Sequence, residues 1–159
     1  MMLKKISKRI FIKHEHLDYN ILNHIYSKLC ETTKDNCDKE NGHILKINKN
    51  IKIDDIFSSS VNGDIIVIVL FEAFILKPEI GKIFDGQICM IFSNGIFVNI
   101  SNKQKVLIPL SYLTDFTYNE KDKIFHNDNK ILKLNDNIKV IIEGVKYAKN
   151  SFNCFGRVI

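Results

Sequence analysis

The chain has 159 residues, 45% of them hydrophobic, and a formal net charge of +5. This length suits one or two small domains. The charge is much lower than in ribosomal or chromatin proteins, but it favours contact with phosphate groups or acidic protein surfaces. The longest apolar run, Ile65 to Leu76, contains Glu72 and is shorter than the roughly 18 residues of a membrane span, so no membrane partner is expected.

The N-terminal half predicts a small sheet with one helix. Ile6 to Ile12 alternates apolar and polar side chains, as a half-buried strand does. A helix follows, with Asp18 as its expected N-cap, because apolar residues recur at helical spacing. These residues are Leu17, Ile21, Leu22, Ile25 and Leu29.

Three further strands are expected before the middle of the chain. Gly42 to Ile47 and Ile51 to Ile56 are short. The pair Asn62-Gly63 is typical of a tight turn, and the apolar run Ile65 to Leu76 after it is long enough for a buried central strand.

The C-terminal half predicts five strands. The first two are Ile88 to Phe92 and Ile96 to Ile100, joined by the turn residues Ser93-Asn94-Gly95. The third, Val106 to Leu110, should be short, at an edge or ending at Pro109, because proline cannot donate a ladder hydrogen bond. The last two are Asn137 to Val145 and Phe152 to Ile159, both rich in β-branched or aromatic residues.

This order resembles an S1 domain, a five-stranded barrel of the oligonucleotide-binding class. The S1 pattern GxVxxIxxxGxFVxI is matched by Gly86, Ile88, Ile91, Gly95, Phe97, Val98 and Ile100. Leu107, Ile108 and Ser111 stand where the family has a hydrophobic pair followed by serine. The alternative is a small barrel without a ligand, because a fold does not by itself determine a function.

Nearly the whole chain resembles the large stalk subunit of archaeal and eukaryotic RNA polymerases, which is the seventh subunit in polymerase II. The anchors of this resemblance are Gly42 to Leu45, Phe74 to Pro78, Gly81 and Ile141 to Gly144. The segments Phe116 to Glu120 and Lys123 to Phe125 are somewhat more similar to the polymerase III paralogue. The chain lacks tryptophan and the tryptophan-containing tail of that paralogue.

The resemblance implies an α+β protein with an RNP-like tip domain over residues 1–78 and an S1 domain over residues 79–159. It implies a non-catalytic subunit that docks on the core polymerase near its clamp and pairs with a small stalk subunit of the polymerase II fourth-subunit type or its polymerase III equivalent. Nascent single-stranded RNA and initiation factors would be its other partners. The expected location is the nucleus, or a viral factory or virion if a virus encodes the protein. The expected docking residues are Ile51, Ile53, Ile56 and Phe57.

RNA binding is expected on the barrel. Phe97 matches the stacking phenylalanine of S1 domains, whereas Asn94 and Pro109 replace an aromatic residue and a histidine that many members have. Phe97 could equally be an ordinary packed side chain. The expected phosphate contacts are Lys103, Lys105, Lys139, Lys146 and Arg157. Lysines on strand edges are also common as protection against edge pairing.

The sequence indicates no catalytic residue, metal or cofactor. It contains no GxxxxGK[ST], GxSxG or HExxH motif. Cys30 and Cys37 lack the close spacing of zinc ligand pairs, and His14 and His16 have no third ligand beside them in the sequence.

Two other classes of function remain as alternatives. One is a free-standing S1 RNA-binding accessory protein in translation or RNA decay. The other is an S1-bearing nuclease, which is disfavoured because hydrolysis would need clustered carboxylates. Copurification with polymerase subunits would separate the stalk subunit from the free-standing protein.

Overall fold

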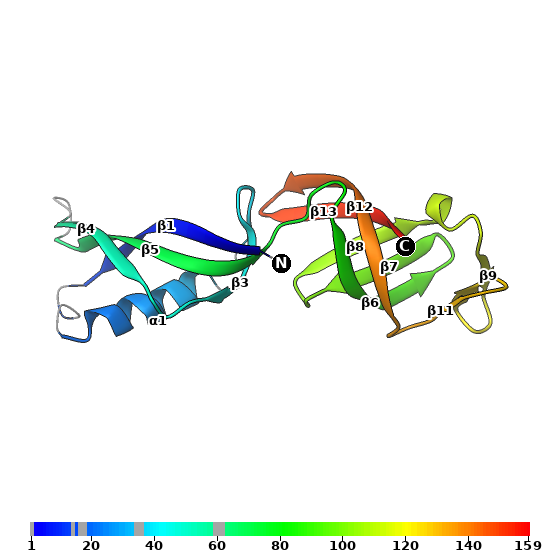
Figure 1. Ribbon diagram of the computed structural model, residues 1–159, viewed down its shortest axis with the longest axis horizontal. Helices are drawn as coiled ribbons and strands as arrows, with labels where there is room; N and C mark the ends of the chain where they lie inside the picture. The colour runs from blue at the N-terminus through cyan, green and yellow to red at the C-terminus, as the bar shows by residue number, and fades with distance from the viewer. Residues whose placement is uncertain (1, 14, 16–18, 34–36, 59–62) are drawn as a thin grey trace. The chain divides into compact units, whose positions relative to one another are not determined.

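A computed structural model describes residues 2–13, 15, 19–33, 37–58 and 63–159 (Figure 1). The chain divides into two compact units, Met1–Lys77 and Pro78–Ile159. The described residues are mostly β-strand, with one α-helix and a closed barrel. No helix among them is long and apolar enough to cross a membrane.

The first unit is built on a long central strand, β5 (Ile65–Leu76). β1 (Met2–Ile12) pairs antiparallel with it from Met2 opposite Ile75 to Ile12 opposite Ile65. On its other edge, β5 pairs with β3 (Gly42–Ile47) and β4 (Lys52–Ser58), and β3 also pairs with the short β2 (Cys37–Asp38). The expected central strand is therefore confirmed.

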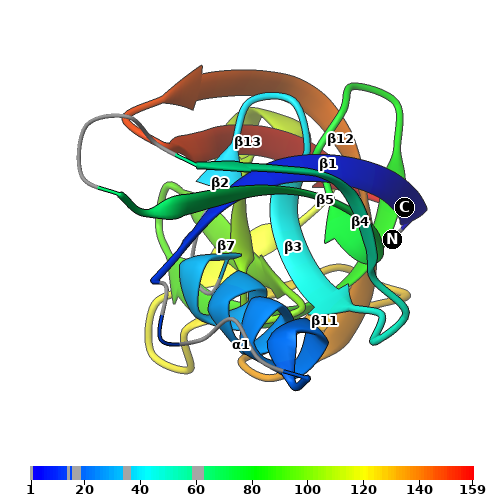
Figure 2. The same cartoon turned by 90° about the vertical axis from the view of Figure 1, so that its left-hand side faces the viewer.

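One helix, α1 (Ile21–Thr33), packs on one face of this sheet (Figure 2). Ile25 and Leu29 are fully buried against inward side chains of β1 and β5, as the helical spacing predicts. Leu22 is exposed, which corrects the expectation that it belongs to the apolar face. The expected N-cap Asp18 and the residues Leu17, His14, His16 and Asn62 lie outside the described residues.

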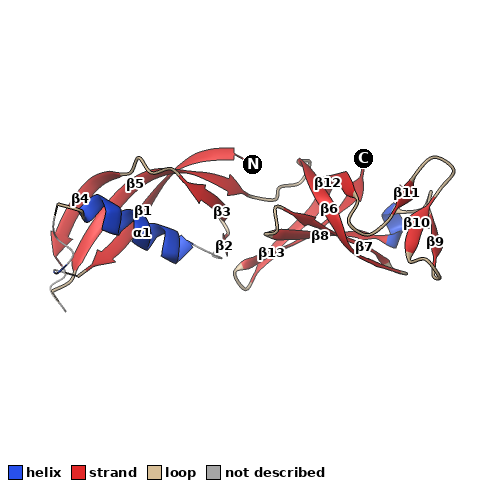
Figure 3. Cartoon of the chain, turned by 90° about the horizontal axis from the view of Figure 1, so that it is seen from below, coloured by secondary structure: helices blue, strands red, loops and turns tan. Residues whose placement is uncertain are grey.

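The second unit contains a closed barrel in the strand order β12-β13-β8-β7-β6 (Figure 3). Its residues 78–159 are all described. Its strands are β6 (Ile83–Phe92), β7 (Gly95–Ile100), β8 (Gln104–Pro109), β12 (Asn137–Ala148) and β13 (Ser151–Val158). Neighbouring strands are antiparallel except β13 and β8, whose parallel pairing closes the barrel.

Gly95, predicted in a turn, and Pro109, predicted near the end of a strand, both have clear structural roles. A Cβ atom on Gly95 would collide with the carbonyl oxygen of Ile108, so β7 and β8 can approach closely only with glycine there. Pro109 is the last residue of β8, as its missing donor predicts. A single 3₁₀ turn, η2 (Leu110–Tyr112), follows it.

The segment between η2 and β12 forms a small separate sheet that the sequence did not predict. Its strands are β9 (Thr117–Asn119), β10 (Ile124–His126) and β11 (Ile131–Leu132). Phe125 and Leu132 are fully buried there, and the Tyr118 ring packs on Phe125 with centroids 5.1 Å apart. The three strands are only two or three residues long, which is too short for a two-residue period to be recognised.

Candidate nucleic-acid interface

Outward-facing apolar side chains cross the barrel in a line that we call the apolar row. It consists of Met90, Phe97, Leu107 and Phe155, which are successive register partners on β6, β7, β8 and β13. Their strand neighbours point inward: Ile96 and Val98 are fully buried on either side of Phe97. Met90 is 50% exposed and Phe155 is 42% exposed, so this row presents apolar surface to solvent.

Two aromatic pairs extend the apolar row. Phe92 stacks on Phe97 with ring centroids 5.7 Å apart. Tyr112, from η2, stacks on Phe155 with centroids 6.3 Å apart and an interplanar angle of 12°. Tyr112 and Phe155 are exposed, whereas Phe92 and Phe97 are partly buried. Aromatic rings at a protein surface are the groups on which nucleobases stack.

Gly144 determines how the Phe155 ring lies. A Cβ atom on Gly144 would collide with three carbon atoms of that ring, so the ring lies directly over the β12 backbone. Gly144 itself is buried, although Phe155 is exposed. Glycine at this position therefore leaves room for the Phe155 ring to lie against the barrel, where Tyr112 stacks on it.

A second, polar row runs beside the apolar row. It consists of Asn137, Gln87, Asn99 and Lys105, which are successive register partners on β12, β6, β7 and β8. Asn99 is two residues from Phe97 on β7, and Lys105 is two residues from Leu107 on β8, so the two rows share the outer face of the barrel.

A β-bulge allows both rows to face outward on β6. Gln87 and Met90 are three residues apart, an odd spacing that would put them on opposite faces of a regular strand. The register shifts between Ile88 and Met90, so Cys89 is the extra residue and both side chains face outward. The Cys89 thiol donates a hydrogen bond to the carbonyl oxygen of Phe97 over 3.4 Å.

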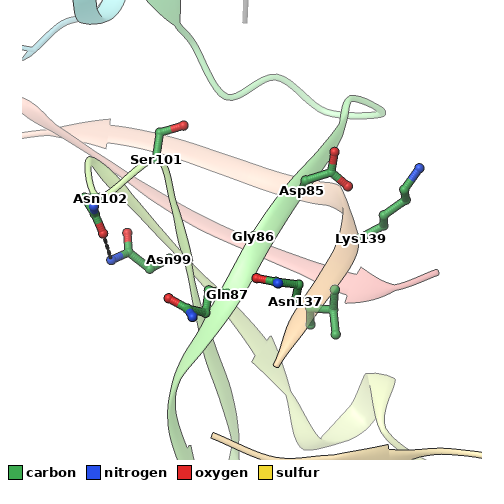
Figure 4. Close-up of a pocket in the computed structure, with 9 residues that line it drawn as sticks. Asp85, Gly86, Gln87, Asn99, Ser101, Asn102, Asn137 and Lys139 are labelled. Carbon is green, nitrogen blue, oxygen red and sulfur yellow. Dashed lines mark hydrogen bonds between the residues drawn. The ribbon is translucent and has the colours of Figure 1, made fainter. Parts of the chain in front are cut away.

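The polar row lines part of a pocket of about 460 Å³ on the outside of the barrel (Figure 4). Four of its side chains are amides, and we call it the amide pocket. Its lining residues are Asp85, Gly86, Gln87, Asn99, Ser101, Asn102, Asn137, Ile138 and Lys139. Gln87 Nε2 donates to the carbonyl oxygen of Asn135 over 3.2 Å, and Asn99 Nδ2 donates to Asn102 Oδ1 over 3.2 Å.

The structure separates the cations expected to contact phosphate. Lys105 is in the polar row, and Lys103 is exposed in the turn that precedes β8. Lys139 lines the amide pocket opposite Asp85 in the register of β6 and β12. The other two lie along the β12–β13 hairpin: Lys146 is exposed, and Arg157 forms an ion pair with Glu143, with Nε 2.8 Å from Oε1.

The expected docking residues also fall into two groups. Ile51 and Ile53 are partly buried and pack against the core of the first unit. Ile56 and Phe57 are exposed on β4, which covers most of the strand predicted over Ile51 to Ile56. Of the four expected docking residues, therefore, Ile56 and Phe57 are the ones that present apolar surface to a partner.

The sheet of the first unit has a face that α1 does not cover. Alternation along β1 and β5 places Leu3 opposite Phe74 and Phe11 opposite Ile66 on this face. Leu3, Phe11, Leu70 and Phe74 are exposed there. We call these residues the open face. Exposed apolar side chains that gather on one face can mark a protein interface.

No group of three or more His, Cys, Asp or Glu side chains within the described ranges could hold a metal ion. The Cys37 thiol is buried, and this burial together with the nearby Asp38 carboxylate raises its pKa. A raised pKa disfavours the thiolate that a nucleophile or a metal ligand requires.

Comparison with known proteins assigns the barrel to a family. The family model described as the S1 RNA binding domain matches residues 77–154. The chain contains an S1 domain. The S1 domain predicted from the sequence of the C-terminal half is thereby confirmed.

Sequence relatives of the chain match over less than half of it. The polyribonucleotide nucleotidyltransferase of Ehrlichia chaffeensis is 28% identical over 71 residues, and that of Ehrlichia canis is 30% identical over 71 residues. Each match covers 45% of this chain, and the chain spans 8% of the length of these relatives.

Among solved structures, the apo form of Mycoplasma genitalium RNase R aligns with a TM-score of 0.40 at 24% identity, over 48% of this chain and 13% of that one. The same enzyme in complex with ribose methylated single-stranded RNA aligns with a TM-score of 0.43 at 25% identity, over 50% of this chain and 13% of that one.

Three residues of the S1 domain's outer face were missed by sequence reasoning. Phe155 could have been found, because the inward positions Phe152 and Cys154 fix the alternation of β13 and put Phe155 outside. Tyr112 lies in a 3₁₀ turn, and Phe92 ends a bulged strand, so no simple period places either ring.

Proposed function

We propose that this protein is a non-catalytic RNA-binding protein whose S1 domain binds single-stranded RNA. The observation that supports this proposal most strongly is the outer face of β6, β7, β8 and β13, where the apolar row lies beside the polar row. Bases would stack on Phe97, Tyr112 and Phe155, while Lys103 and Lys105 contact the backbone.

Stacking contributes more than charge in this proposal. Two stacked aromatic pairs lie on the outer face, whereas Arg157 is paired with Glu143 and Lys139 lies opposite Asp85 in the register of β6 and β12. Base–aromatic stacks contribute about 1–3 kcal/mol each. Binding would therefore persist at moderate salt, and the protein would hold unpaired RNA in preference to a duplex, whose bases are already stacked.

The test is binding of a fluorescent unstructured RNA by the full chain. We expect Phe97→Ala and Phe155→Ala each to weaken affinity by about 1–3 kcal/mol. Tyr19→Ala is the matched control, because Tyr19 is an exposed aromatic residue of the first unit. Absence of RNA binding by the unaltered chain, or equal losses in all three variants, would contradict the proposal.

A second candidate function is the large stalk subunit of a multisubunit DNA-directed RNA polymerase, of the polymerase III or II type. It is favoured by the open face and by the exposed Ile56 and Phe57, which give the first unit apolar surface for partners. In this role the first unit would dock on the core polymerase and a small stalk subunit, in the nucleus or a viral factory, while the S1 domain meets nascent RNA and initiation factors.

The second candidate is tested by affinity purification and mass spectrometry. We expect the chain to copurify with polymerase subunits, and Phe57→Glu to abolish this by placing a charge in an apolar contact. Ser58→Glu is the control, because Ser58 is an exposed neighbour on the same strand. A chain that is a well-behaved monomer and copurifies with no polymerase subunit would leave the free-standing RNA-binding protein as the function.

A further inference from the structure

We infer that this chain self-associates through the two free edges of the first unit's sheet, with β1 of one copy beside β4 of the next. The occupant of each edge is a second copy of this chain. The inference is independent of RNA binding, because every residue that carries it lies in the first unit.

The first step is that both edge strands have unpaired backbone groups. Within the described residues, β1 and β4 each pair with β5 alone, on its two opposite sides. Alternate residues of each edge strand therefore direct their N–H and C=O groups away from the sheet, where a further strand can pair with them. β1 has 11 residues, which is longer than most strands, so this free edge is a long one.

The second step is the charge of the two edges. Lys8 and Arg9 lie on β1, whereas Asp54 and Asp55 lie on β4. The structure shows no ion pair for any of these four side chains among the residues it describes. Two copies that meet through the same strand would bring like charges together, which protects a sheet edge. Opposite charges meet only where β1 of one copy pairs with β4 of another.

The third step is the register of the sheet. Arg9, Ile68 and Asp55 are successive partners across β1, β5 and β4, so Arg9 and Asp55 lie at the two ends of one row, on the same face. A second copy moved sideways by three strands, with no shift along them, has its Arg9 beside Asp55 of the first copy. Neighbouring strands are about 4.8 Å apart, so these two side chains can then form a cross-strand ion pair.

The neighbouring rows are compatible with the same register. Phe11 and Phe57 end the next row on this face, and both are exposed, so the contact would bring two aromatic side chains together. Lys52, the only cation on β4, ends the row of Ser7 and therefore meets no cation. Asp55 Oδ1 accepts the backbone N–H of the next residue over 2.9 Å, which leaves Oδ2 for the arginine.

The contact is parallel and open-ended. β1 and β4 both run antiparallel to β5, so they run in the same direction, and copies related by a sideways step pair in parallel. Each added copy brings one further free edge, so more copies can join, as in any head-to-tail contact that does not close into a ring. We therefore expect masses beyond that of a dimer.

Sedimentation velocity of the full chain without RNA tests the inference. We expect the average mass to rise with concentration beyond that of a dimer. Arg9→Glu leaves carboxylates at both ends of the row, and Asp55→Lys leaves cations at both ends. Each variant alone should therefore associate about tenfold more weakly. An equimolar mixture of the two should associate like the unaltered chain, because contacts between unlike variants again join opposite charges, and so should the double variant.

Lys121→Glu is the matched control, because Lys121 is an exposed lysine of the second unit and its reversal changes the net charge as Arg9→Glu does. It should associate like the unaltered chain. A chain that stays monomeric at every concentration would overturn the inference, as would a mixture and a double variant that both associate as weakly as the single variants.

RNA binding measured on the same samples separates this inference from the proposed function. Phe97→Ala should weaken RNA binding and leave self-association unchanged, whereas Arg9→Glu should do the reverse. A monomer that binds RNA would overturn only the self-association. A chain that self-associates as expected but binds no RNA would overturn only the proposed function.

Discussion

At the scale of single residues, the carboxylates beside the cations decide how strongly RNA binding depends on salt. Arg157 is held by Glu143, and Lys139 lies opposite Asp85. Lys105 faces outward in the polar row next to Leu107, on the stacking surface. The sequence alone made these cations look equivalent, because ion pairing across strands depends on register rather than on spacing in one strand.

We therefore expect Lys105→Ala to change the salt dependence of RNA binding more than Arg157→Ala does. On single strands each phosphate contact contributes about −0.7 to the slope of log affinity against log salt. Lys105→Ala should reduce the magnitude of the slope by about this amount. Arg157→Ala should reduce it by less, because the guanidinium is already neutralised by Glu143.

Glu143→Gln supplies the control for this comparison, because it removes the competing carboxylate without removing the cation. It should make the slope steeper if Arg157 can then reach a phosphate. Fluorescence anisotropy from low to moderate salt measures all three slopes. A slope unchanged by Lys105→Ala would show that the RNA path does not cross β8.

At the scale of strands, the contact between Gly144 on β12 and the Phe155 ring on β13 shapes the stacking surface. We expect Gly144→Ala to destabilise the barrel by about 1–3 kcal/mol through overpacking and to weaken RNA binding by displacing the ring from Tyr112. Chemical denaturation and RNA binding of the same variant would measure both effects.

The double variant Gly144→Ala with Phe155→Ala separates this collision from a general cost of replacing the glycine. Without the ring, the new methyl group has space, so most of the stability lost in Gly144→Ala should return. A double variant whose free energy of unfolding falls by the sum of the two single losses would contradict the contact.

The same scale shows what the sequence could and could not predict. Period-two alternation located the barrel strands, and helical spacing located α1. The bulge at Cys89 was not predictable, because it depends on the pairing of β6 with β7. The pairing of Tyr112 with Phe155 was also missed, since it joins residues far apart in the chain. The sequence therefore predicted that RNA binds on the barrel and that Phe97 belongs to the binding surface, but it did not predict the other aromatic rings of that surface.

At the scale of the whole molecule, the chain divides between Lys77 and Pro78. Each unit has its own buried core, centred on α1 and β5 in one and on the barrel interior in the other. We expect a fragment of residues 78–159 to fold alone and to bind RNA within about threefold of the full chain, a difference below 1 kcal/mol.

The complementary fragment provides the contrast for this prediction. Residues 2–77 contain the open face and should show no RNA affinity of their own, but should self-associate or require a partner to stay in solution. Circular dichroism, size-exclusion chromatography and RNA binding of both fragments would test the division. An unfolded 78–159 fragment, or RNA binding confined to residues 2–77, would contradict it.

We propose above that single-stranded RNA binds the outer face of the S1 domain, where the apolar and polar rows lie side by side. Chemical-shift mapping by NMR during titration with unstructured RNA tests it most directly. We expect the largest shifts at Phe97, Asn99, Lys105, Leu107 and Phe155. Shifts confined to β9, β10 and β11, or to the sheet of the first unit, or no shifts at saturating RNA, would contradict it.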